Sequence, residues 1–565
     1  IHGVIIPKFT ARNGSHKFRF AIDFGTTNTH IEYSVDGSTS SNPFDITEKD
    51  MQIQKLHITD DYMINDVFNS DFIPATIGGE SLYGYPMRTV ISESNNTNWD
   101  KAVLAMANVN IPYTYEKSLS LPYNVLHTDL KWSTNTEDKK RASKYIESIL
   151  LMLRTKVLLN NGDLSKTEIV WFYPASMTQN RFNKFKAEWE NTFATLFGAP
   201  ISNIIAASES VAPYYYHKAK KGATSTVVSV DIGGGTTDVL IVDKGEPKYL
   251  TSFRFAANTI FGDGYSYDSD SNGFVNKYKD IITNQLETNN LRGLKAVLKS
   301  VLDKRVSTDV IAFLFSLASN KEIKKEKVEI NFAKMLADDN RGKYVVILFY
   351  VAIVYHIAKL MKAKGFDMPR HMTFSGNGSK VLNILSTNDA TLVRLTKIIF
   401  EEIYAQSYSI DGLDIIRPAN SKESTCKGGI ILTPFQSQDY GEIKDMKTIL
   451  IGTDNEKFAD VHMTYNDVTE ADLDSVVDVI KEYIEFTFKL DKKFSFYDNF
   501  DVDRSIMNKV KDLCYRDIRT YLENGLAIKK SEIAQDGADD NLEETLFFYP
   551  LVGIINAVVR NIYQM

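Results

Sequence analysis

The chain has 565 residues, which is more than one ordinary hydrophobic core accommodates, so two or more domains are expected. Hydrophobic residues make up 43% and charged residues 24%, the usual balance of a globular protein, and the formal net charge is −7. That charge disfavours nucleic-acid binding, which needs a basic face. With only Cys426 and Cys514, neither a disulfide framework nor a cysteine metal site is expected, and a reducing, cytoplasmic location fits.

The most apolar run of the sequence extends from Tyr344 to Tyr355 and is followed by His356 and Lys359. A bilayer span needs roughly 18–20 apolar residues, and this run is shorter. We therefore expect a buried helix here and no membrane span.

The first predicted elements form a strand–turn–strand unit. Residues Lys17 to Asp23 have the pattern of a strand, Gly25-Thr26-Thr27-Asn28 that of a turn, and Ile31 to Val35 that of a returning strand. Ser38 to Asn69 is polar and rich in turn residues, which indicates an insertion or surface loop.

A helix, a buried strand and a second helix follow. Glu137 to Leu159 is predicted helical, and Glu168 to Tyr173 is a buried type of strand. A short strand candidate covers Ile201 to Ala207, and Glu209 follows it at the start of another helix. Aromatic and aliphatic residues at steps of three and four mark the helix between these strands: Phe182, Phe185, Trp189, Phe193 and Leu196.

The strand–turn–strand pattern then recurs. Thr226 to Asp231 is a predicted strand, Gly233-Gly234-Gly235 a turn and Val239 to Val242 a returning strand. Asp231 lies 208 residues after Asp23 (231 − 23), so the sequence predicts two lobes of similar construction in an α/β fold.

The second half is mostly helical in pattern. Helices dominate from Phe274 to Lys364, and a strand at His371 to Phe374 leads into Gly376-Asn377-Gly378. Thr469 is the expected N-cap of a later helix.

The first turn has the composition of a phosphate site. Gly25 allows close backbone approach, and turn N–H groups with the hydroxyls of Thr26 and Thr27 can donate to phosphate oxygens, next to Asn28. Asp23 would repel phosphate unless a cation lies between them, which points to Mg²⁺ bound through water. The alternative is an ordinary hairpin turn with a polar strand end.

The second turn repeats this chemistry. Asp231 again ends a strand, and three glycines in a row, Gly233 to Gly235, have an entropic cost that a simple hairpin does not require. The third unit, with Gly376, Asn377 and Lys380, leads from a strand to a helix start, as nucleotide sites often do, but it contains no P-loop string.

Taken in order, these units resemble the phosphate-1, phosphate-2 and adenosine motifs of the actin/heat-shock-chaperone/sugar-kinase superfamily, from Lys17 to Leu432. The similarity is greatest to the nucleotide-binding domain of DnaK-type chaperones and to bacterial actins. The resemblance implies a two-lobed actin-like ATPase fold with duplicated ribonuclease-H-like lobes, mixed sheets flanked by helices. On this basis residues 1–222 form lobe I, 223–438 lobe II, and 439–565 a mostly helical C-terminal addition.

The resemblance also implies a site that binds ATP and Mg²⁺ between the lobes. Asp23 and Asp231 would hold hydrated magnesium, and Glu209 with Asp231 would position the attacking water. Either Lys101 or Lys131 would correspond to the chaperone lysine that reaches the γ-phosphate. The residues implied to cradle the phosphates are Gly25, Thr26, Thr27 and Asn28 on one side and Gly233, Gly234, Gly235 and Thr236 on the other, with Thr236 near the γ-phosphate; Gly376, Asn377 and Lys380 would border the adenosine.

After residue 438 the sequence departs from DnaK-type chaperones, since it has neither their apolar-acidic linker nor a β-rich peptide-binding domain. The main hypothesis is an ATPase that acts as a conformational switch on a protein partner of unknown identity. The alternatives are a filament-forming actin-like protein, a small-molecule phosphotransferase, and a nucleotide-binding scaffold with little turnover. The sequence leaves the oligomeric state open.

Overall fold

The computed structural model describes most of the chain. The described residues are 14–52, 73–81, 83–113, 124–132, 136–174, 177, 179–221, 226–265, 272–409, 412–418, 421–433, 464–536, 542 and 544–565. Most of the predicted insertion near residues 38–69 lies outside them.

The chain forms two compact units. Unit 1 contains residues 1–220 and 422–439, and unit 2 contains residues 221–421 and 440–565. The residues that we assigned to a separate C-terminal segment are therefore part of unit 2, as far as they are described.

Unit 1 is built on a six-stranded mixed sheet. Its central strand β1 (Phe18–Phe24) pairs antiparallel with β2 (Asn28–Val35) on one side and parallel with β8 (Glu168–Tyr173) on the other. The strand order is β3-β2-β1-β8-β9, with β4 also paired to β2. The remaining strands are β3 (Asn42–Pro43), β4 (Met87–Arg88) and β9 (Ile204–Ser208).

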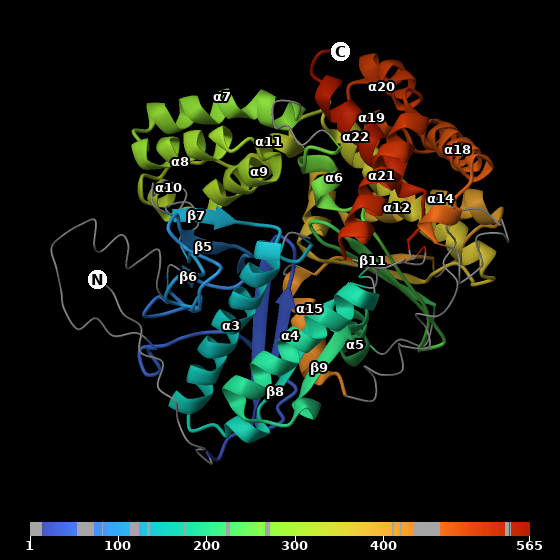
Figure 1. Ribbon diagram of the computed structural model, residues 1–565. Coiled ribbons are helices and arrows are strands. Elements are labelled where there is room, and N and C mark those ends of the chain that lie inside the picture. Colours follow the sequence, from blue (N-terminus) through green and yellow to red (C-terminus); the bar gives the residue numbers. More distant parts are fainter. Residues whose placement is uncertain are drawn as a thin grey trace. The chain divides into compact units, whose positions relative to one another are not determined.

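Two long helices, α3 (Thr136–Leu159) and α4 (Gln179–Phe197), pack against each other beside this sheet (Figure 1). The predicted aromatic stripe of α4 faces the sheet, where Trp189 stacks on Trp171 of β8 with ring centroids 5.6 Å apart. Both tryptophans are fully buried, so this stack anchors α4 on the central strands.

Unit 2 repeats the same arrangement. Its sheet has the order β12-β11-β10-β13-β14, in which β10 (Val227–Ile232) pairs antiparallel with β11 (Thr237–Asp243) and parallel with β13 (His371–Ser375). The outer strands are β12 (Glu246–Phe253) and β14 (Asp414–Ile416). Three antiparallel strands followed by two parallel ones, in both units, confirm the predicted α/β fold with duplicated ribonuclease-H-like sheets.

The apolar run predicted as a buried helix is part of α12 (Lys343–Ala363) in unit 2. By length and composition α12 is apolar enough to cross a membrane, but 94% of its most apolar window is buried inside the structure. It packs against α14 (Asp389–Tyr404) and α18 (Glu470–Phe494) and is thus a core helix of the unit.

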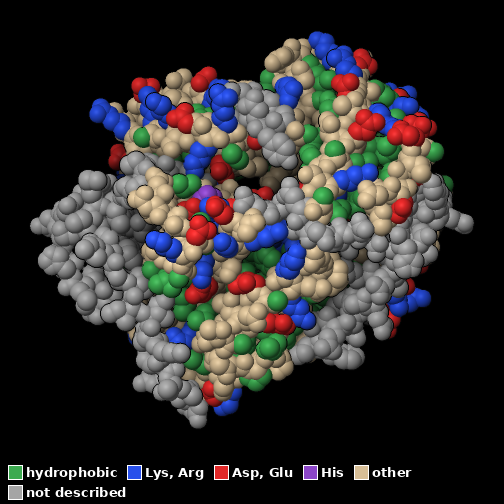
Figure 2. All heavy atoms as spheres, viewed as in Figure 1, with side chains coloured by type: hydrophobic (Ala, Val, Ile, Leu, Met, Phe, Trp, Pro, Cys, Tyr) green, Lys and Arg blue, Asp and Glu red, His purple; other side chains and the backbone are tan. Residues whose placement is uncertain are grey.

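The C-terminal part of unit 2 is helical, as predicted. Thr469 forms a capping box with Asp472 at the start of α18. The last helix, α22 (Phe548–Asn561), packs against α12, against α21 (Ile518–Asp536) and against α7 (Gly273–Thr288) (Figure 1). We call residues 464–565 the C-terminal addition. Acidic and basic side chains intermingle in the upper right of Figure 2. One ion pair of the addition joins Arg519 to Asp474 at 2.8 Å.

Two boundaries between the units in the sequence, at residues 220/221 and 421/422, fall in the helices α5 (Val211–Lys221) and α15 (Ser421–Ile431). Within unit 1 these helices touch where Gly428 meets Ala212. A Cβ atom on Gly428 would lie 1.9 Å from the carbonyl oxygen of Ala212, so only glycine allows this approach.

Candidate functional site

The first predicted phosphate turn lies between β1 and β2. Asp23 pairs with His30 and Phe24 with Thr29, which leaves Gly25, Thr26, Thr27 and Asn28 as the connecting residues. Asp23 itself is buried, with 4% of its surface exposed. The hairpin thus has a carboxylate at its strand end and hydroxyl-bearing residues in its turn.

Side chains from other elements brace this turn. Thr89 donates its hydroxyl to the carbonyl of Gly25 at 2.7 Å, and its own N–H donates to the carbonyl of Thr27 at 2.8 Å. Trp132 donates its indole N–H to the Thr26 hydroxyl at 2.9 Å. The turn is consequently held in one shape before any ligand binds.

Glu209 lies at the same edge of the unit 1 sheet as Asp23. Strands β1, β8 and β9 are parallel, so their carboxyl ends share one edge, and Glu209 directly follows β9. The N–H of Glu209 donates to the carbonyl of Tyr173 at the end of β8, at 3.0 Å. The helix predicted to open at Glu209 begins two residues later, at Val211.

Of the two candidate lysines, Lys131 is the one that lies beside Glu209. Its Nζ donates to Glu209 Oε1 in an ion pair whose side chains are 2% and 13% exposed, respectively. Lys101 is exposed. The sequence left open whether Lys101 or Lys131 corresponds to the chaperone lysine. In the structure, Lys131 is the one of the two that contacts Glu209.

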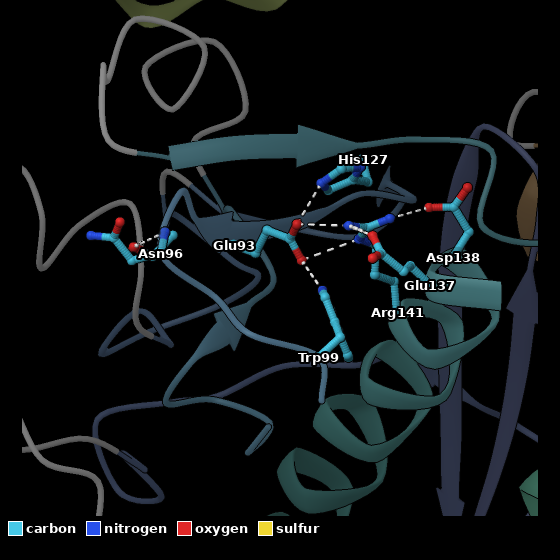
Figure 3. Close-up of polar contacts among 8 residues, drawn as sticks. Glu93, Asn96, Trp99, His127, Glu137, Asp138 and Arg141 are labelled. Carbon is cyan, nitrogen blue, oxygen red and sulfur yellow. Dashed lines mark hydrogen bonds and ion pairs between the residues drawn. The ribbon is translucent and has the colours of Figure 1, made fainter. Parts of the chain in front are cut away.

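The segment that carries Lys131 follows β7 (Asn124–His127), which belongs to a small three-stranded sheet with β5 (Ile91–Ser94) and β6 (Val109–Asn110). A cluster around Glu93 ties this sheet to α3 (Figure 3). Arg141 of α3 donates to both carboxylate oxygens of Glu93, at 2.8 and 3.1 Å.

His127 and Trp99 complete the partners of Glu93. The His127 Nε2 atom is 3.0 Å from Glu93 Oε1, and the Trp99 indole donates to Oε2 at 3.0 Å (Figure 3). Burial raises the pKa of Glu93, but the hydrogen bonds from Arg141 and the neighbouring positive charges outweigh it and hold that pKa below its ordinary value. Glu93 is therefore ionised at neutral pH, and its bonds fix β7 four residues before Lys131.

The second predicted phosphate turn, in unit 2, has the same register as the first. Asp231 pairs with Asp238 and Ile232 with Thr237, so that Gly233, Gly234, Gly235 and Thr236 connect the strands. The Gly233 N–H donates to the Thr236 carbonyl at 2.8 Å. In both units, four residues thus lie between the last paired residues of the hairpin, and a buried aspartate lies two positions before the turn.

The third predicted motif, which follows β13, packs directly on the second phosphate turn. Gly376 has a φ of +79°, and a Cβ atom there would lie 2.3 Å from Asp231 Oδ1 and 2.3 Å from the Ile232 carbonyl. A Cβ atom on Gly378 would lie 2.1 Å from the Gly233 carbonyl. The two glycines therefore allow the turn after β13 to lie against the glycine turn after β10.

The other residues of the third motif lie around the contact between these two turns. Ser375 donates its hydroxyl to Asp231 Oδ2 at 3.1 Å, which orients that carboxylate. Asn377 and Lys380 lie in the helical turn Asn377–Val381, where Asn377 is half-buried and Lys380 exposed.

Asp23 in unit 1 and Asp231 in unit 2 each offer a buried strand-end carboxylate, the kind of protein ligand that Mg²⁺ prefers. Among the described residues, no group of three or more His, Cys, Asp or Glu side chains could hold a metal ion by itself. A magnesium ion at either carboxylate would accordingly take further ligands from water and from substrate phosphates.

Sequence reasoning did not identify the residues that support the turns. Thr89, Trp132 and the Glu93 cluster occur in stretches without a recognisable motif, and only the fold brings them to the first turn or to Lys131. The tryptophan at 132, next to a candidate lysine, was the one signal available in the sequence.

No family model matches the sequence, and neither does any curated protein. Among solved structures, MreB5 of Spiroplasma citri bound to ADP and the same protein bound to AMPPNP are each 12% identical, cover 75% of this chain and 98% of their own, and have TM-scores of 0.34 and 0.33. The ethanolamine utilization protein EutJ from Carboxydothermus hydrogenoformans is 10% identical over 75% of this chain and 92% of its own, with a TM-score of 0.31. The paired sheet topology confirms the predicted fold itself.

Proposed function

We propose that the chain binds Mg-ATP, hydrolyses it slowly and acts as a conformational switch on a protein partner. The observation that carries the proposal is the pair of hairpin turns with equal register, one in each unit, each preceded by a buried aspartate. Two such turns suit a polyphosphate because backbone N–H groups can donate to its oxygens at both of them.

In this proposal the first turn binds phosphate mainly through Thr26, Thr27 and the backbone of Gly25. The second turn, Gly233 to Thr236, binds mainly through backbone N–H groups, since three of its residues have no side chain. Gly376, Asn377 and Lys380 would border the adenosine, next to the second turn. Phosphoryl transfer needs chiefly positioning and charge neutralisation, and these residues supply both.

Asp23 and Asp231 would hold the hydrated magnesium ion. When bound, that ion would neutralise charge on the phosphates. Within the protein, the Ser375 hydroxyl keeps the Asp231 carboxylate oriented, and burial of both aspartates limits their motion.

Glu209 would accept a hydrogen bond from the attacking water and orient it. Lys131, now paired with Glu209, would donate to the transferred phosphate, since a lysine ammonium is a compact charge that suits phosphate. A Lys131 that moves to phosphate would leave the Glu209 carboxylate available to the water.

Isothermal titration of the full chain with Mg-ATP, followed by measurement of phosphate release, tests the proposal. We expect Asp23→Ala to impair binding and turnover together, and Glu209→Gln to retain binding while turnover falls by about 100-fold or more, the usual size of a general-base contribution. A matched control is Glu168→Gln, at the opposite end of β8. A wild-type chain that binds no nucleotide would refute the proposal.

The switch is tested separately from the chemistry. We expect small-angle scattering to differ between the nucleotide-free chain and the Mg-ATP complex of Glu209→Gln, because a ligand shifts a conformational equilibrium when it binds one state better. Identical curves would leave a scaffold, and an ATP-dependent pellet on sedimentation would point to a filament. A cytoplasmic location is part of the proposal and fits the two buried cysteines, Cys426 and Cys514, which form no disulfide.

A further inference from the structure

One segment of unit 2 has the second phosphate turn on one side and the C-terminal addition on the other. It consists of residues 253–258, which connect β12 to the short helix α6 (Ala257–Phe261). We call residues 253–258 the strap.

Backbone hydrogen bonds attach the strap to the phosphate turn. The Asn258 N–H donates to the Gly234 carbonyl at 2.8 Å, and the Ala257 N–H donates to the Gly233 carbonyl at 3.3 Å. The Thr237 hydroxyl, at the end of the turn, donates to the Phe255 carbonyl at 2.6 Å. Three bonds therefore fix the turn, with its three glycines, to the strap, and movement of the strap displaces the turn.

Aromatic packing attaches the strap to the C-terminal addition. The Phe548 ring of α22 stacks on Phe253 with centroids 4.0 Å apart and lies 4.7 Å from the ring of Phe255. All three rings are almost fully buried. Such a core contact transmits displacement because packed interiors deform little.

Charged contacts attach the middle of the strap to the same addition. Arg254 donates through its guanidinium to Glu532 at 2.5 Å and through its backbone N–H to Glu544 at 3.2 Å. Glu544 also accepts a hydrogen bond from Tyr549 at 2.8 Å and lies 3.5 Å from Lys529. Burial raises the pKa of Glu544, but the charges of Lys529 and Arg254 outweigh it and hold that pKa below its ordinary value, so the carboxylate is charged.

From these contacts we infer that the C-terminal addition sets the geometry of the second phosphate turn, with Arg254, Glu532 and Phe548 as positioning residues. None of them belongs to the phosphate motifs; they act through the strap. The consequence for function rests on the proposed nucleotide site: whatever shifts the C-terminal helices changes phosphate affinity, and phosphate binding in turn changes the C-terminal helices, because coupling between two sites is reciprocal.

Glu532→Gln tests this inference, because it removes the charge that holds Arg254 while keeping the shape of the side chain. The matched control is Glu246→Gln, which removes the exposed ion pair with Lys248 at the other end of β12. Glu532 is 30% exposed, so the variant is expected to fold, and a thermal unfolding scan verifies it.

The first readout needs no nucleotide. Hydrogen exchange at the amides of Gly233 and Asn258 is expected to accelerate about fivefold or more in Glu532→Gln, the low end of typical coupling between sites. Amides of β13, which pairs with the other side of β10, serve as the internal reference and are expected to keep their rates. Unchanged exchange at the turn would overturn the inference, and so would equal acceleration throughout the sheet.

The second readout separates positioning from general loosening. Mg-ATP affinity is expected to fall by about fivefold or more in Glu532→Gln, whereas adenosine affinity stays the same, because adenosine has no phosphate for the displaced turn to bind. Glu246→Gln is expected to change neither affinity. An equal loss for ATP and adenosine would overturn the inference. If the wild type binds no ATP, the proposed function fails, while the exchange experiment still decides whether the addition controls the turn.

Discussion

His356 is a buried neutral base whose protonation should destabilise unit 2 in acid. It lies in α12, fully buried, with its ring 5.3 Å from Phe547 and 5.0 Å from Phe548 of the C-terminal addition and 5.6 Å from Phe253. Its Nδ1 atom has no hydrogen-bond partner among the described residues. Burial in these aromatic surroundings lowers the pKa of His356 from 6.5 to about 3.

The sign and the size of the effect follow from that shift. Because the pKa is lower in the folded than in the unfolded chain, the unfolded chain binds more protons at this histidine between pH 6.5 and about pH 3. The contribution of neutral His356 to the free energy of unfolding is fully present above pH 6.5 and is lost as the pH falls towards 3. At pH 4.5, two units below 6.5, the loss is about 3 kcal/mol, from about 1.4 kcal/mol per unit.

Urea unfolding of the wild type and of His356→Phe at pH 7.5 and pH 4.5 measures how much unfolding free energy the protonation of His356 removes. Phenylalanine cannot titrate and suits the aromatic surroundings, so the variant is expected to lose about 3 kcal/mol less than the wild type over this interval. Any repacking cost applies at both pH values and cancels. Parallel stability profiles for wild type and His356→Phe would refute the reasoning.

Three further predictions concern the site and its supports. Gly376→Ala places a Cβ atom 2.3 Å from a strand-end carboxylate at a φ of +79°, so it should cost about 2–4 kcal/mol of unfolding free energy in urea; a loss below 1 kcal/mol would contradict the close approach. Glu209→Gln should destabilise the chain by about 3 kcal/mol, because it leaves the buried charge of Lys131 without its partner. Adding Lys131→Met to that variant should restore most of the lost stability. Additive losses in this double-mutant cycle would refute the pairing. Glu93→Gln should cost about 2 kcal/mol and speed amide exchange in β7, and unchanged exchange there would show that the cluster does not hold the small sheet.

Much of the fold could be predicted because its local signals are strong. The strand predicted at Glu168–Tyr173 has those bounds in the structure, and the helix predicted at Glu137–Leu159 begins one residue earlier. The two hairpins were recognisable because each combines an apolar strand, a terminal aspartate and a glycine turn. Such patterns depend on neighbours in the sequence, which a single sequence displays.

The rest depends on contacts between distant residues. Glu93 and Arg141 are 48 positions apart, and nothing in either segment indicates that they form one cluster. That Lys131 pairs with Glu209 likewise follows only from the folded chain, because the two residues are 78 positions apart. The helices after residue 463 were predicted as helices, but their packing into unit 2 through Phe548 and Arg254 has no sequence signature. The roles of the proposed site residues themselves stay predictions.

The two phosphate turns share a register but differ in what holds them, and this difference assigns them different tasks. Side chains from Thr89 and Trp132 brace the first turn, and its own threonines offer hydroxyls. The second turn has three glycines and is held through the strap and through the close approach of Gly378. A turn without side chains takes its shape from its surroundings. If the proposed function holds, a signal from the C-terminal addition would therefore enter the site through the second turn, while the first turn would bind phosphate in a constant shape.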